Sequence, residues 1–210
     1  MPVSVNTKTI SGKFAFLGPV SPALLLLLVT LLCSTAVIAS FSVKQMDVLL
    51  RKNGLELSGQ LELELSRKTE EALSKGIPLE VIFELNLFRE RDFIWDERLG
   101  GWQFQRKILF HALSNQYLIT TRLPDSEPVQ ESFPSLQEAL TSMGSFESLE
   151  LKLDDSDINT DIIFNTSSPL YVDIRARLDI ESLPTPLRPV AYTSRSWRLN
   201  SGWSSWSVKR

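Results

Sequence analysis

Arginine and aromatic side chains are concentrated between residues 89 and 106, where they could form a contact surface. Arg89 and Arg91 precede Trp95, and Trp102 follows within the next turn and strand. Guanidinium groups stack on aromatic rings and donate several hydrogen bonds, a combination common where a protein contacts proteins, glycans or lipid headgroups. Ion pairing between two facing strands is the simpler interpretation, because the neighbouring acids balance the charge: Glu90, Asp92, Asp96 and Glu97.

Three tryptophans near the C-terminus form a second candidate binding surface. Trp197, Trp203 and Trp206 could make an aromatic shelf or lie at a membrane interface. Large rings more often close one end of a hydrophobic core, which is the interpretation we favour. Arg188, between Leu187 and a proline, could bind a carboxylate through two parallel hydrogen bonds, within the domain or on a partner.

One acidic run has part of the spacing of a calcium loop. Its side-chain oxygens fall at alternate positions: Asp155, Asp157, Asn159 and Asp161. Such spacing lets oxygens converge on calcium, but the loop also needs a glycine at its sixth position and a glutamate at its twelfth. Thr160 and Thr166 stand there instead. We therefore predict an acidic loop and no metal site.

The sequence offers few groups for catalysis. His111 is the single histidine, and the alternation of its segment places it on the polar face with Gln103 and Lys107. There is no phosphate-binding glycine loop and no nucleophile elbow, and Cys33 is the one cysteine. We predict no catalytic residue and no cofactor.

The N-terminus indicates export. Residues 1–22 carry Lys8 and Lys13, and residues 23–39 form an uncharged apolar run. That length suits either a transmembrane anchor or a signal-peptide core cleaved after Ala39, and both remain open. Residues 43–208 are then the exported domain, which would face the periplasm from the inner membrane or be released into it.

The exported part is acidic and free of cysteine. All 25 acidic residues follow residue 39, whereas only 20 of the 22 basic residues do, a net charge of −5. Such a domain repels phosphate backbones, so we expect no nucleic-acid partner. It also has to be stabilised by its hydrophobic core alone, without disulfides.

Alternating apolar and polar residues predict a mainly β fold with α+β character. The clearest stripes cover residues 55–65, 79–87, 102–110, 149–153 and 170–180. One wet and one buried face is typical of antiparallel sheets, so we predict an antiparallel β-sandwich. Two short helices are expected at 66–75 and 135–143, after the caps Ser66 and Ser135, besides the N-terminal hydrophobic helix.

Three connecting segments are also predicted. Gly100-Gly101 suggests a hairpin turn, residues 124–134 a surface loop, and the prolines at 184, 186 and 189 an extended segment.

The C-terminal motifs resemble a known family. Leu183-Pro184-Thr185-Pro186-Leu187-Arg188-Pro189, followed by Ser196-Trp197-Arg198-Leu199 and the Trp203 to Trp206 segment, is similar to the closing signature of the proteobacterial domain-of-unknown-function family DUF4390. Upstream segments also fit, so the resemblance covers nearly all of residues 43–206. It implies an export signal or anchor, a Gram-negative envelope location and no assigned activity. Some members lie beside genes for a sensor kinase, which suggests a signalling context.

These observations predict a non-enzymatic interaction or sensory-accessory module of the envelope. Its expected partners are the membrane, through the N-terminal segment, and an envelope protein such as a sensor kinase. One alternative is a carrier that holds a lipid or another apolar ligand between its sheets. Another is a carboxylate- or metal-dependent enzyme, which would need Asp155, Asp157 and Asp161 to converge.

Overall fold

The computed structural model describes residues 40–52, 54–124, 126–152 and 168–210. The predicted hydrophobic segment at 23–39 and the acidic run from Asp155 to Asp161 lie outside these residues. None of the helices within the described ranges is both long enough and apolar enough to span a membrane.

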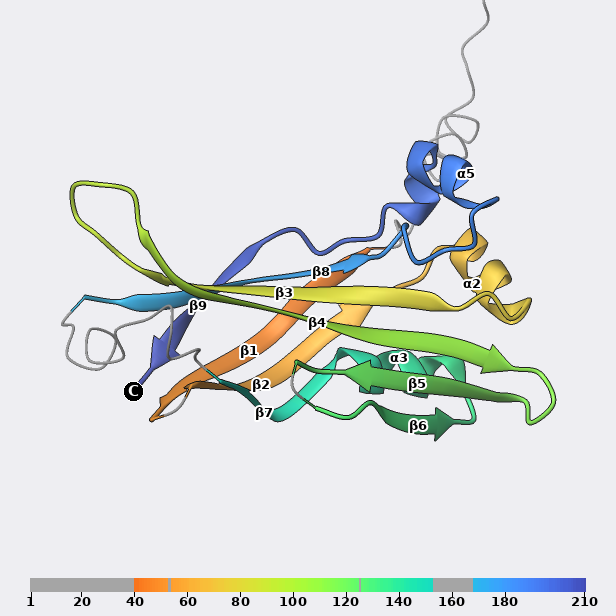
Figure 1. Cartoon of the computed structure of the whole chain (residues 1–210), viewed down its shortest axis with the longest axis horizontal. Helices are drawn as coiled ribbons and strands as arrows, with labels where there is room; N and C mark the ends of the chain where they lie inside the picture. Colours follow the sequence, from red (N-terminus) through yellow and green to blue (C-terminus); the bar gives the residue numbers. More distant parts are fainter. Residues whose placement is uncertain (1–39, 53, 125, 153–167) are drawn as a thin grey trace, which may run out of the picture. The chain divides into compact units, whose positions relative to one another are not determined.

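The described chain is mostly β-structure (Figure 1). Its strands are β1 (Phe41–Arg51), β2 (Gly54–Leu63), β3 (Leu79–Arg89), β4 (Glu97–His111), β5 (Gln116–Arg122), β6 (Val129–Phe133), β7 (Ser145–Lys152), β8 (Leu170–Leu178) and β9 (Ser204–Lys209). Three short α-helices, α2 (Arg67–Ser74), α3 (Leu136–Gly144) and α5 (Arg188–Thr193), and the 3-10 turn η1 (Arg195–Trp197) complete it.

The strands form one mixed sheet in the order β6-β5-β4-β3-β8-β9-β1-β2-β7. Every pair is antiparallel except β9 with β1, which run parallel where Val48 faces Val208. The sheet curls into a half-barrel, so the prediction of a two-sheet sandwich is replaced by a single curled sheet. Alternation identifies the buried face of each strand, but it does not distinguish two facing sheets from one sheet that curls over itself.

The curl brings β4 close to β7, which lies at the far edge of the sheet. The indole Nε1 of Trp102 on β4 donates to the carbonyl of Lys152 on β7 at 2.6 Å. Arg106 lies four residues after Trp102, on the same face of β4. Its Nη1 donates to the carbonyls of Ser142, Met143 and Ser145 at 2.7–3.1 Å. These long-range hydrogen bonds fix the curl, because they join elements that are not neighbours in the sheet.

The predicted apolar stripes make up the core. The inward side chains of β3 are almost fully buried: Leu79, Val81, Phe83, Leu85 and Leu87. Phe83 stacks on Phe104 with ring centroids 5.1 Å apart, and Phe146 of β7 meets both rings edge-on. Aromatic clusters of this geometry add stabilisation beyond their buried area.

Two helices form where their caps predict them. The hydroxyl of Ser66 accepts from the amide of Thr69 at the start of α2, and Gly76 ends that helix with φ +80°. Ser135 accepts from the amide of Glu138 in the same way at the start of α3. These bonds satisfy amides that a helix leaves unpaired at its first turn.

Three local predictions were wrong. Residues 188–193 form helix α5 instead of an extended segment, because Pro189 lies in the first helical turn, where the missing amide is not needed. Within the predicted loop, Val129–Phe133 forms edge strand β6. Gly100 and Gly101 lie inside β4 opposite Leu87 and Asn86, so the hairpin turns earlier, between residues 90 and 96.

Candidate functional site

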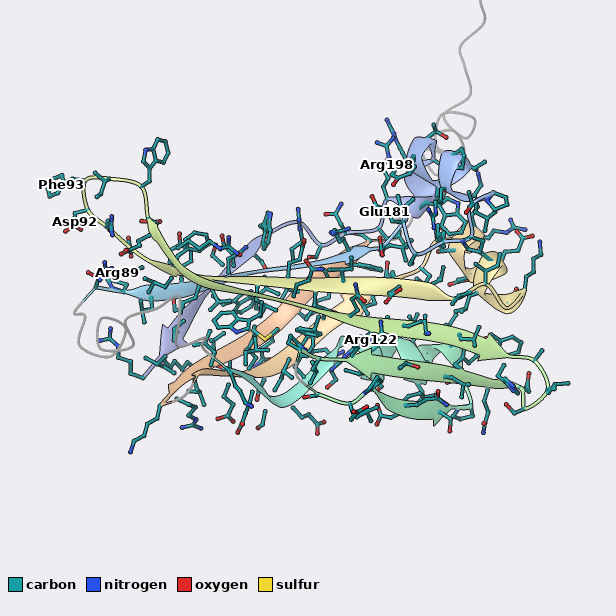
Figure 2. The ribbon with its side chains drawn as sticks, viewed as in Figure 1. Arg89, Asp92, Phe93, Arg122, Glu181 and Arg198 are labelled. Carbon is teal, nitrogen blue, oxygen red and sulfur yellow. The ribbon has the colours of Figure 1, made fainter. Side chains whose placement is uncertain are left out.

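The turn between β3 and β4 carries the most exposed run of apolar side chains in the described chain. Phe93, Ile94 and Trp95 are 96%, 63% and 93% exposed. We call residues 92–96 the hairpin tip. Figure 2 shows Phe93 and Asp92 at the outer end of this hairpin and Arg89 near its base. In Figure 1 the hairpin extends from the end of the sheet opposite α2 and α5.

An ion-pair cluster of Arg89, Arg91 and Glu97 holds the base of the hairpin together. We call these three residues the neck. Arg89 is the last residue of β3 and faces Glu97, the first residue of β4. The Glu97 carboxylate accepts from the guanidinium groups of both Arg89 and Arg91. All three side chains are partly buried, so water screens their attraction less than it would on an open surface.

Asp96 connects the hairpin tip to β8. Its carboxylate accepts from the backbone amide of Arg91 at 3.1 Å and from the Tyr171 hydroxyl at 2.7 Å. The amide of Glu90 donates to the carbonyl of Pro169 at 3.0 Å, just before β8. Hydrogen bonds therefore anchor the turn to β8 and to the residue before it, although the apolar side chains of the turn face solvent.

The same contacts lower the pKa values of the two acids. The Tyr171 hydroxyl and the Arg91 amide lower the pKa of Asp96, while Arg91 and then Arg89 lower the pKa of Glu97. Burial, with the Asp96 hydrogen bond as second cause, raises the pKa of Tyr171 to about 12. Both carboxylates are therefore charged, and Tyr171 is neutral, at physiological pH.

The predicted Arg–Trp surface divides into separate parts. Arg89 and Arg91 form ion pairs with Glu97, as the simpler interpretation expected, and Trp95 lies at the hairpin tip. Trp102 is half-buried and packs against the core on the inner face of β4. The structure thus assigns Trp95 to a solvent-facing element and Trp102 to the closure of the sheet.

The C-terminal candidates also separate. Trp197 is buried, as core closure requires. Trp206 is half-buried on β9 and donates to the Ser204 hydroxyl at 3.1 Å. Trp203 is half-exposed, and the Arg175 guanidinium lies 4.4 Å from its ring centroid. Arg188 donates to the carbonyl of Leu183 at 2.8 Å, a bond within its own segment.

The remaining candidates are the single histidine and the acidic run. His111 is exposed at the end of β4, on the polar face as predicted, and its Nδ1 lies 2.9 Å from the Ser114 hydroxyl. Among the described residues, no three His, Cys, Asp or Glu side chains are grouped to hold a metal ion. The calcium candidates Asp155, Asp157, Asn159 and Asp161 lie outside them.

Side chains from both halves of the curled sheet surround one small void. It is enclosed by Met46, Leu57, Phe83, Leu85, Phe104, Phe146, Leu149 and Ile174, which leave no room for a water molecule. A ligand held there would need several of these side chains to move. This void therefore gives no support to an apolar-ligand carrier.

Sequence patterns identified only part of the hairpin tip. Ile94 was not among the candidate residues, although three consecutive apolar residues between Asp92 and Asp96 interrupt the alternation on both sides. Such an interruption places at least one apolar side chain on the wet face, which is the signal that could have located the tip.

Comparisons with known proteins place the chain in a family. Searches of curated proteins and of solved structures found no match. Residues 39–207 match the family model described as "Domain of unknown function (DUF4390)", so the resemblance is confirmed and the chain belongs to this family.

Proposed function

We propose that the protein is a non-enzymatic interaction module of the bacterial envelope and that the β3–β4 hairpin tip is its docking element. One observation carries the proposal: three adjacent apolar side chains are exposed on a turn that is anchored to the sheet. Contiguous exposed apolar groups on a soluble domain are typical of interaction sites, and tryptophan is prominent among residues that dominate binding energy.

The anchored neck makes the hairpin tip suitable for binding. Ordering a loose loop costs free energy when a complex forms. The Glu97 ion pairs and the Tyr171–Asp96 hydrogen bond order the turn beforehand. Binding energy from Phe93 and Trp95 is then not spent on fixing the backbone.

The charges beside the tip favour a protein partner over a lipid surface. Asp92 and Asp96 flank the three apolar residues, and the pKa of Asp96 is lowered. Anionic lipids repel carboxylates and attract basic segments. We therefore propose an envelope protein, such as a sensor kinase, whose apolar pocket has a basic rim.

Location is part of the same proposal. The apolar run at 23–39 would anchor the chain in the inner membrane with the β-rich domain facing the periplasm, or would act as a signal peptide whose cleavage releases that domain. The family match covers residues 39–207, so it spans the β-rich domain that would follow the apolar run.

Site-specific photo-crosslinking tests the docking element. The crosslinking residue p-benzoylphenylalanine is placed at Ile94, or at Leu113 as a control, in the full chain in cells that make it. Leu113 is also exposed and apolar, but it lies on the β4–β5 turn. We expect a discrete protein adduct from position 94 alone. Equal adducts from both positions, or lipid adducts only, would contradict a protein-docking tip.

A further inference from the structure

A groove lies on the outer face of the sheet, beside α5 and apart from the hairpin tip. It has a volume of about 590 Å³ and is bordered by β3, β4, β8, the turn after β8 and the segment from α5 to Asn200. Figure 2 shows Glu181 and Arg198 close to α5 on this side. A groove of this size is within the range of small-molecule sites.

Charge in the groove is compensated within the protein. Arg175 pairs with Glu84 through Nη2 at 2.6 Å, and the Nε of Arg177 lies 3.5 Å from the same carboxylate. Arg198 donates to the Tyr192 carbonyl at 3.0 and 3.2 Å. Two further carboxylates, Asp179 and Glu181, line the groove. Three arginines and three acids leave no net charge to attract an ionic ligand.

Uncharged polar groups remain available in the groove. The side chains of Gln103 and Gln105 project from β4 on its polar face, and within the described part of the chain neither has a hydrogen-bond partner. Each amide offers two donor hydrogens and an acceptor oxygen. The floor includes Ile82, which is 4% exposed although it lies on the otherwise polar face of β3.

One aromatic ring lines the groove, and a second stacks on one of the arginines that line it. Tyr192 is 51% exposed on α5, and its hydroxyl donates to Glu181 at 3.4 Å. Trp203 is 46% exposed and supports the Arg175 guanidinium. Exposed ring faces beside planar amide, guanidinium and carboxylate groups match the alternating C–H faces and hydroxyls of a sugar.

A peptide fits this groove less well than a sugar. Strand β3 pairs with β4 on one side and with β8 on the other, and β8 is bonded beyond β9 to residues 199–201, so an added peptide strand would find no free edge on β3 or β8. Recognition must then come from side chains alone. We propose that this groove binds a neutral oligosaccharide, with Gln103, Gln105 and Arg177 binding hydroxyls and Tyr192 packing against a ring face.

Titration with neutral tetrasaccharides tests the groove. The full chain is placed in lipid nanodiscs, because detergents with sugar headgroups would compete, and is titrated with chitotetraose, maltotetraose and an end-blocked tetra-alanine peptide. Binding is measured by calorimetry and by NMR shifts of the glutamine side-chain amides. Variants are Gln105→Ala and Tyr192→Ala, and Gln130→Ala on exposed β6 is the matched control.

We expect at least one tetrasaccharide to bind saturably and to shift the Gln103 and Gln105 amide signals. Each groove variant should weaken that binding about tenfold, a loss of about 1.4 kcal/mol, whereas Gln130→Ala should leave it unchanged. Gln105 is a surface residue, so Gln105→Ala remains informative if Tyr192→Ala unfolds. The proposal is overturned if neither sugar binds, if the variants bind like the natural chain, or if only the peptide binds.

Discussion

The guanidinium of Arg106 lies 4.6 Å from the ring centroid of Phe146, inside the curl of the sheet. Arg106 comes from β4 and Phe146 from β7, so the contact spans the interior between two strands that are not neighbours in the sheet. Nη1 also donates to three carbonyls at the end of α3 and the start of β7. A helix leaves such carbonyls unpaired at its last turn, and a cation there also complements the helix dipole.

Arg106 is held without an acidic partner in direct contact. Burial lowers the pKa of Arg106 to about 10, because the charged guanidinium loses hydration inside the protein. Its Nε is the one buried side-chain polar atom in the described residues that lacks a hydrogen bond. The three carbonyls and the Phe83 and Phe146 rings compensate for this cost.

Replacing Arg106 should therefore loosen the curl. Arg106→Met keeps most of the side-chain length but leaves the carbonyls of Ser142, Met143 and Ser145 without their donor. We expect the free energy of unfolding to fall by about 2–3 kcal/mol, measured by urea denaturation. Arg122→Met, on the exposed end of β5, is the control and should change stability by less than about 0.5 kcal/mol. Equal stabilities for the two variants would show that Arg106 does not maintain the curl.

Gly144 allows α3 to approach β2 closely. A Cβ at this position would overlap the carbonyl oxygen of Leu61 on β2, and backbone cannot rotate away as a side chain can. We expect Gly144→Ala to lower the free energy of unfolding by about 2–3 kcal/mol. Gly76→Ala is the comparison, because Gly76 has open space but a φ of +80°, and it should cost only about 1 kcal/mol. The opposite order in thermal denaturation would refute the close-approach argument.

The contacts of Asp96 and Glu97 that order the hairpin should weaken at acid pH. Because the folded-state pKa values of Asp96 and Glu97 are lowered, their stabilisation is complete above the ordinary carboxyl values and is lost as pH falls through the lowered ones. NMR titration of the Asp96 carboxyl carbon measures this. Its pKa should be higher in Tyr171→Phe, which lacks the hydroxyl donor. An unchanged Asp96 pKa in that variant would exclude the hydroxyl as the main cause.

Tyr171 should give the opposite dependence at alkaline pH. Its folded-state pKa is raised from 10.0 to about 12, so its contribution is complete below the ordinary value and is lost as pH rises toward the folded one. Ultraviolet titration of the three tyrosines should show one that ionises near pH 12. If the ionisation near pH 12 is absent from the titration of Tyr171→Phe, it belongs to Tyr171. A titration of the natural chain without that ionisation would contradict the raised pKa of Tyr171.

The aromatic side chains of the hairpin tip should contribute to binding without contributing to stability. Phe93 and Trp95 are almost fully exposed, so truncating them removes little buried area. We expect Phe93→Ala and Trp95→Ala to change the free energy of unfolding by less than about 0.5 kcal/mol each. Denaturant unfolding measures this, with the buried Trp197→Ala as the destabilising reference. A large loss for either tip variant would show that the tip packs on the domain.

Sequence patterns located the strands better than their arrangement. Alternation identified the buried stripe from Leu79 to Leu87 because one face of a strand must be apolar wherever that face is buried. Ser58-Gly59 interrupts the alternation of residues 55–65, and the β2–β7 register shifts there, between Leu57 and Gly59. Such features depend on residues close in sequence, which a local pattern can report.

The remaining features depend on contacts distant in sequence. The curl requires Arg106 to contact residues 142–145. The sequence indicates this contact only by a charged residue within an apolar stripe. Gly101 resembles a turn residue, yet it lies within β4, where a Cβ would overlap the Arg98 side chain. The hairpin tip and the outer groove depend on which exposed side chains the folded sheet gathers, and no local period encodes that.

The most direct test of the docking account is the yield of the protein adduct from a crosslinker at Ile94 when Phe93→Ala and Trp95→Ala are combined in the full chain. Exposed aromatic residues that insert into a partner's pocket dominate its affinity. The account predicts that the yield falls about tenfold or more while the unfolding free energy stays unchanged. An undiminished yield of the same adduct from a folded double variant would contradict the hairpin tip as the docking element.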